Sequence, residues 1–148
     1  MMSLFIWAEN VSESLETFSD LDFQIRVWIH GDGPEVSSLD EATCVLFDDS
    51  DFEGFLKLPE VLFNQKLFSA LNEVYLALDA VTDDVMSDKK MNEAFLKSAL
   101  WERIILLAKK AKMELDKARK HWVDNKRGKI LRFCLFSKML LTKSMDVM

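Results

Sequence analysis

Apolar residues recur at steps of three and four along the second half of the chain. They are Leu96, Leu100, Ile104, Leu107, Ala111, Leu115, Ala118 and Trp122. This spacing places them on one face of an α-helix. An apolar face of that length is stable in water only when other elements cover it. The sequence therefore predicts a long helix over residues 90–122 that packs on the rest of the chain.

A second stripe with the same period lies upstream of the first. It consists of Phe63, Leu67, Leu71, Val74, Leu78 and Val81. Pro59 suits the first turn of such a helix, where the missing N–H of proline costs nothing. We expect a helix over residues 59–81 that packs against the first one.

The first third of the chain has a different pattern. Residues 23–30 alternate between apolar and polar or bulky side chains, which is typical of a strand with one face on a core. Residues 42–47 and 4–8 read as two further strands, with a short helix over residues 10–20. The fold class predicted is therefore α+β, with a small N-terminal β-sheet and a predominantly helical C-terminal part. The last apolar run, residues 130–141, fits either a helix or a strand.

Composition favours one compact domain. The chain has 148 residues, 49% of them hydrophobic and 30% charged, with only four Gly and two Pro. A chain of this kind can bury a large core, so we expect residues 1–148 to form a single globular domain. Cys44 and Cys134 are the only cysteines, and each lies in an apolar run, where a thiol packs as a small hydrophobe.

Neither end of the chain predicts a membrane or an export signal. The apolar start lacks a preceding basic residue and soon acquires Glu9 and Glu13, which is the wrong pattern for a secretion signal. The run over residues 130–141 is too short to span a bilayer and contains Arg132 and Lys138. We therefore expect a cytoplasmic protein with no membrane partner.

Charge is distributed very unevenly along the chain. Residues 1–88 carry 19 acidic and 3 basic residues, a net charge of −16, whereas residues 89–148 carry 6 acidic and 16 basic residues, a net charge of +10. Such a division either holds the two halves together or presents an acidic surface to a basic partner.

One acidic stretch, residues 48–54, resembles part of a known site. With Asp49 as position one, Asp51, Glu53, Gly54 and Glu60 occupy positions three, five, six and twelve of an EF-hand calcium loop. Glu at position five and Lys57 at position nine depart from that pattern, and no second loop is available to pair with. We expect an exposed acidic turn with Ser50 capping a short helix, and no metal site.

Catalytic patterns are absent from the sequence. His30 and His121 are the only imidazoles, and neither lies at a ligand or triad spacing from other reactive side chains. The Gly31-Asp32-Gly33 segment lacks the spacing of a phosphate-binding loop and reads as a turn. We predict no catalytic residues, no cofactor and no enzymatic activity.

The basic segment from Lys109 to Arg132 could contact nucleic acid phosphates. The same segment also fits the solvated face of an amphipathic helix, with its positive charge partly neutralised by the acidic half of the chain. Since the pI of the whole chain is about 5.0, we expect no nucleic acid partner.

In size, acidity and lack of a recognisable site, the chain resembles bacterial toxin-immunity proteins, although no residue motif carries the likeness. The resemblance implies a non-catalytic protein, monomeric when free, that neutralises a basic partner such as a nuclease toxin. Charge complementarity would steer and tighten such an association. The residues expected to contact the partner are Asp48, Asp49, Asp51, Glu53, Asp83 and Asp84.

Two other functions fit the same observations. An acidic secretion chaperone or a phage-encoded inhibitor would also need an acidic surface, and a chaperone of this kind would be a dimer with an apolar groove. An enzyme with an unrecognised set of catalytic residues is the third alternative.

Overall fold

The computed structural model describes the backbone of residues 3–34, 37–88 and 92–146, and the side chains in those ranges except for 82–88 and 127–146. Contacts divide the chain into two compact units, Met1–Asp116 and Lys117–Met148. Each unit is described by itself. The expectation of a single domain over residues 1–148 stays a prediction.

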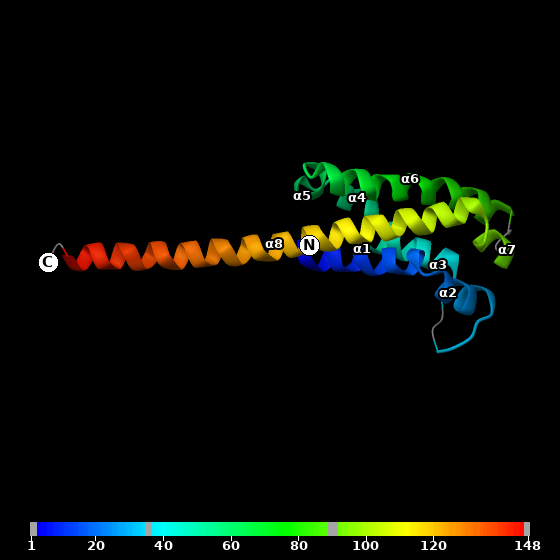
Figure 1. Cartoon of the computed structure of the whole chain (residues 1–148), viewed down its shortest axis with the longest axis horizontal. Coiled ribbons are helices and arrows are strands. Elements are labelled where there is room, and N and C mark those ends of the chain that lie inside the picture. Colours follow the sequence, from blue (N-terminus) through cyan, green and yellow to red (C-terminus); the bar gives the residue numbers. More distant parts are fainter. Residues whose placement is uncertain (1–2, 35–36, 89–91, 147–148) are drawn as a thin grey trace. The chain divides into compact units, whose positions relative to one another are not determined.

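Every regular element in the described ranges is a helix (Figure 1). In chain order they are α1 (Leu4–Ser19), α2 (Leu21–Phe23), η1 (Gln24–Ile29), α3 (Leu39–Cys44), η2 (Val45–Asp49), α4 (Phe52–Leu56), α5 (Pro59–Leu62), α6 (Gln65–Asp88), α7 (Glu93–Leu96) and α8 (Ala99–Asp146), where η denotes a π-helix. The first unit contains the elements from α1 to α7 and the part of α8 from Ala99 to Asp116. In the second unit, the described backbone continues α8.

The predicted N-terminal β-sheet is wrong, because the residues expected to form its three strands are helical. Residues 4–8 form the start of α1, residues 23–30 cover the last residue of α2, the whole of η1 and its C-cap, and residues 42–47 fall in α3 and η2. The fold of the described residues is all-α and not α+β.

A buried glutamine explains why the alternation over residues 23–30 was misleading. Gln24 is fully buried, although the strand pattern assigned it to the solvent face. Its Nε2 donates to the Thr17 carbonyl at 2.9 Å, and its Oε1 accepts from Trp101 Nε1 at 2.8 Å. With both ends of the amide bonded, its burial costs little. The buried side chains of η1 are thus Gln24 and Val27, which follow a helical step of three.

The second expected strand is helical for a similar reason. The buried residues there are Leu39, Ala42, Thr43 and Leu46, at steps of three, one and three, which is one face of a helix. Ser38 begins this helix, since its side chain accepts a hydrogen bond from the Glu41 N–H at 3.1 Å.

Helix α1 is the longest element of the N-terminal third. It buries Ala8, Val11, Leu15 and Phe18 at steps of three and four. Ser3 caps it by accepting from the Ile6 N–H. The short helix predicted over residues 10–20 is therefore present, and it extends back through the residues predicted as a strand.

The C-terminal helices are present with different bounds from those predicted. The helix expected over residues 59–81 is broken into α5 and α6, and Phe63, predicted to be in the core, lies at the break and is 83% exposed. The helix expected over residues 90–122 is broken into α7 and α8, and Leu100 is exposed. Residues 89–91 lie outside the described residues. Residues 130–141 belong to α8, so this segment is helical.

Among the described residues, none of the helices has both the length and the apolar character needed to cross a membrane.

Two similar assemblies make up much of the first unit. In one, η1 packs on α7, and Trp28, Phe95 and Trp101 form a chain of ring contacts at 5.6 and 6.2 Å. In the other, η2 packs on α4, and the rings of Phe47, Phe52 and Tyr75 contact one another at 5.3–6.0 Å. In each case a π-helix, a short helix and a long helix contribute one aromatic ring.

Substitution of Ile104 tests the buried face of α8. Ile104 is fully buried, so Ile104→Asp places an unpaired charge in the core and should lower the free energy of unfolding by about 3–5 kcal/mol. Leu106→Asp is the matched control, because Leu106 is 59% exposed and the change there should cost about 0.5 kcal/mol or less. Urea unfolding followed by circular dichroism measures both, and equal stabilities would show that the buried face is misassigned.

A double-mutant cycle tests the buried hydrogen bond between Gln24 and Trp101. Gln24→Met leaves the indole N–H buried without an acceptor and should cost about 1–3 kcal/mol. In a Trp101→Phe background, which has no indole N–H, the same change should cost less, giving a coupling energy of about 1 kcal/mol. Additive effects of the two substitutions would rule out an energetically significant bond.

Candidate functional site

Two neighbouring segments of the first unit contain carboxylates but no Lys or Arg. They are α1, residues 4–19, and α3 with η2, residues 39–49. The two segments pack on each other. Their exposed carboxylates are Glu9, Glu13 and Glu16 on α1, and Asp40, Glu41, Asp48 and Asp49 on α3 and η2. We call these seven carboxylates the acidic face.

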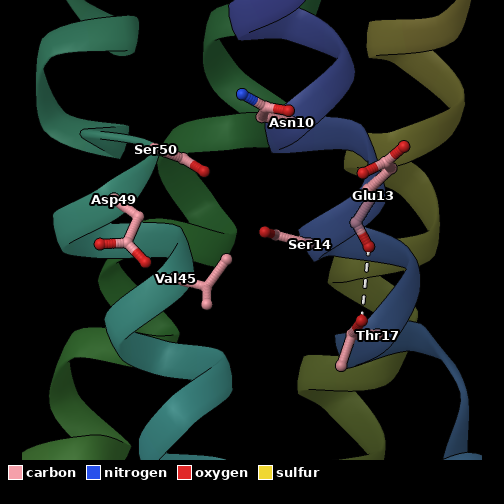
Figure 2. A pocket seen from close by; sticks show the side chains of 7 residues that line it. All are labelled: Asn10, Glu13, Ser14, Thr17, Val45, Asp49 and Ser50. Atoms are coloured by element: carbon pink, nitrogen blue, oxygen red, sulfur yellow. Dashed lines mark hydrogen bonds between the residues drawn. The ribbon is translucent and has the colours of Figure 1, made fainter. Parts of the chain in front are cut away.

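A pocket of about 370 Å³ lies between α1 and η2 within this face (Figure 2). It is lined by Asn10, Glu13, Ser14, Thr17, Val45, Asp49 and Ser50. Two hydrogen bonds hold its surroundings in place. The indole N–H of Trp7 donates to the backbone carbonyl of Ser50, which ties α1 to the end of η2. Thr17 Oγ1 donates to the Glu13 carbonyl at 3.4 Å, within α1.

Of the predicted partner-binding residues, Asp48 and Asp49 lie on the acidic face. Both are exposed at the end of η2, and Asp49 also lines the pocket. Neither forms an ion pair with a described residue.

Cys44, one turn earlier and predicted to be buried, is exposed. Although exposed, its thiol is partly desolvated, which raises its pKa, and Asp40 and Asp48 raise that pKa further. A raised pKa leaves less of the thiol as thiolate, the nucleophilic form, at neutral pH.

Asp51 has a structural role in the local fold. It is the N-cap of α4, and its Oδ1 accepts from the Gly54 N–H at 3.1 Å, with φ of 44° at Asp51. A Cβ at Gly54 would lie 2.3 Å from Asp51 Oδ2. Gly54 therefore leaves room for the capping carboxylate. The sequence predicted Ser50 as the capping residue, and that prediction is wrong, because the cap is Asp51.

The remaining predicted contacts do not belong to the acidic face as the structure describes it. Glu53 forms an ion pair with Lys57 at 3.5 Å, four residues further on in the chain. The Asp83 and Asp84 side chains lie outside the described residues, although their backbone belongs to α6.

The calcium-loop positions do not form a loop. Helix α4 begins at Phe52 and α5 at Pro59, so the positions after Asp51 fall in two short helices and the turn that joins them. Within the described part of the chain, no group of three or more His, Cys, Asp or Glu side chains is arranged to hold a metal ion.

The two histidines take part in contacts at the protein surface. His30 Nε2 lies 4.0 Å from Glu93 Oε2, and His121 Nε2 lies 3.2 Å from Asn125 Nδ2.

Sequence reasoning missed the α1 side of this site. Glu13 and Ser14 line the pocket, but no pattern in the sequence pairs them with Asp49 and Ser50, some 36 residues away. The helical stripe of α1 was a usable signal, because it shows that Glu9, Glu13 and Glu16 share the face opposite the buried residues.

The site as a whole presents oxygen acceptors and negative charge. Seven carboxylates with no basic residue on the same two segments attract cations and repel phosphates. The arrangement is suited to binding a positively charged partner.

A family described as a domain of unknown function, DUF7945, matches residues 2–121. Searches of curated proteins and of solved structures found no match. The matched region contains all of the acidic face and all of the pocket. The chain belongs to the DUF7945 family.

Proposed function

We propose that this protein binds a basic protein through its acidic face, and that it acts as a non-catalytic, cytoplasmic immunity protein that neutralises a bacterial nuclease-type toxin. The observation that carries the proposal is the acidic face itself, seven exposed carboxylates on two packed segments that contain no Lys or Arg. Nuclease clefts are basic because they bind phosphates, so a face of this charge is complementary to them.

Internal neutralisation of these charges is the competing explanation. The ion pairs of Lys57 with Glu53, Lys97 with Glu93 and Lys112 with Asp116 each join residues four apart in the sequence. None involves the acidic face, and no carboxylate of that face forms an ion pair with a described residue. Two of the seven, Asp40 and Glu41, lie in the first turn of α3, where their negative charges interact favourably with the helix dipole and stabilise the helix. The other five have no comparable structural role.

Electrostatic complementarity of this kind acts mainly on the rate of association. A concentrated patch of one sign steers an oppositely charged partner and raises the rate constant of association by orders of magnitude at low salt. At physiological ionic strength the effect extends over about 8 Å, so the charges must lie together on one surface. The packing of α1 on α3 and η2 places the two acidic segments side by side, and Glu13 and Asp49 line the same pocket.

Paired charge reversal tests the proposal without disturbing the capping role of Asp51. Asp48→Lys with Asp49→Lys should leave the melting temperature nearly unchanged, because both side chains are exposed. The same variant should slow association with the basic toxin encoded beside its gene by about tenfold or more at low salt. Stopped-flow or surface plasmon resonance measures the rate, and a growth assay measures protection.

The matched control is Glu60→Lys with Glu73→Lys, which changes the net charge by the same amount at exposed positions of α5 and α6. We expect the control to associate and protect nearly as the wild type does. If both pairs slow association equally, only net charge matters and the acidic face is not the interface. If the wild type neither binds nor protects against the neighbouring basic protein, the immunity role is wrong.

A further inference from the structure

Two serine hydroxyls point into the pocket between α1 and η2 (Figure 2). Ser14 is 7% exposed and Ser50 is 3% exposed. Neither hydroxyl has a hydrogen-bond partner among the described residues. In the same part of the chain, no fully buried polar side-chain atom lacks a partner. The two hydroxyls are therefore reachable only through the pocket that they line.

Such hydroxyls are not needed for the fold. A largely buried hydroxyl without a protein partner costs free energy unless water or a ligand satisfies it. Alanine has nearly the same shape and would avoid that cost. Two of them facing one pocket from two different elements indicate a place where a ligand is bound.

The charges around the pocket select the kind of ligand. Glu13 lies at one side and Asp49 at the other, and no described residue forms an ion pair with either. A carboxylate on each side favours a cation and excludes an anion. Val45, 45% exposed, adds an apolar wall that can contact the methylene groups of a ligand.

From these features, we infer that the pocket is the subsite that takes one lysine side chain of the basic protein partner. This inference rests on the proposed function. An ammonium group is a compact charge with three donors, and the two hydroxyls with the flanking carboxylates supply acceptors from several directions. A guanidinium group is planar and prefers both oxygens of one carboxylate, whereas Glu13 and Asp49 stand on opposite sides.

The lysine subsite can be tested without the partner. The probe is Nα-acetyl-lysine-methylamide, titrated into the ¹⁵N-labelled full chain and followed by NMR. We expect saturable shifts of the amides of residues 10–17 and 45–50. The uncharged norleucine analogue should give no saturable shift, and the arginine analogue should bind several-fold more weakly.

Substitution by alanine at two serines of α1, Ser14 and Ser12, should have opposite effects on probe affinity and on stability. Ser14→Ala should weaken the lysine probe by about tenfold, as the loss of a hydrogen bond to a charged group does, and should leave the melting temperature equal or higher. Ser12→Ala should do the reverse. Ser12 is buried, and its Oγ donates to Asp116 Oδ1 at 2.8 Å, so its loss lowers the melting temperature and leaves the probe affinity unchanged.

Ser50→Ala provides a second test on the other wall of the pocket and should also weaken the probe. The inference is overturned if the lysine probe gives no saturable shift, if the norleucine analogue binds equally well, or if Ser14→Ala and Ser50→Ala both bind as the wild type does. Identical shifts with calcium chloride would assign the pocket to a metal ion and would also overturn it.

These outcomes are separable from those of the proposed function. If reversal of Asp48 and Asp49 slows partner binding but the probe does not bind, the pocket assignment fails and the acidic face stands. If the probe binds the pocket but the reversal has no effect on the partner, the acidic face is not the interface, and the pocket binds an amine that is not the partner's lysine.

Discussion

The buried amide of Gln24 fixes the position of α1, on which the rest of the first unit depends. It bonds the Thr17 carbonyl near the end of α1 and the indole of Trp101 in the first turn of α8. The bond to Trp101 is buried and the bond to Thr17 is partly buried, so loss of either partner would leave a desolvated polar group. One side chain of η1 thus links α1 to α8. Ser12 and Asp116 add a second link between α1 and α8.

The position of α1 in turn shapes the acidic face. At the other end of α1, the Trp7 indole bonds the Ser50 carbonyl, and the Trp7 ring contacts Phe55 of α4. The end of η2 is therefore held against α1, with Asp49 and Ser50 opposite Glu13 and Ser14. The like charges of the two segments repel one another, so apolar packing and these hydrogen bonds must hold them together. A basic partner would relieve that repulsion, which is a physical reason for the association to be favourable.

The helical stripes of the second half were readable from the sequence because burial there follows one period over many turns. The N-terminal third was misread for two reasons. The alternation over residues 23–30 assigned Gln24 to solvent, and the partners that satisfy it, Thr17 and Trp101, are not visible in local sequence. The signal at Ser38 was available, since Ser38 followed three residues later by Glu41 is the pattern of a capping box at a helix start.

The candidate site was predicted in part. Charge along the chain pointed to the acidic half, and Asp48 and Asp49 do lie on the acidic face. The sequence predicted a short helix after the acidic turn but with Ser50 as its cap. The structure shows that Asp51 caps this helix, α4, and that Glu53 within it forms an ion pair with Lys57. Glu13, Ser14 and Ser50 join the site only through the packing of α1 on η2, which is a long-range contact.

Amide hydrogen exchange of the full chain, free and bound to the proposed basic protein partner, tests most directly whether the acidic face is the interface. We expect slower exchange on binding in residues 10–17 and 45–50, on both walls of the pocket, with the exchange of α6 unchanged. Slower exchange confined to α6, with none in the two walls, would contradict it.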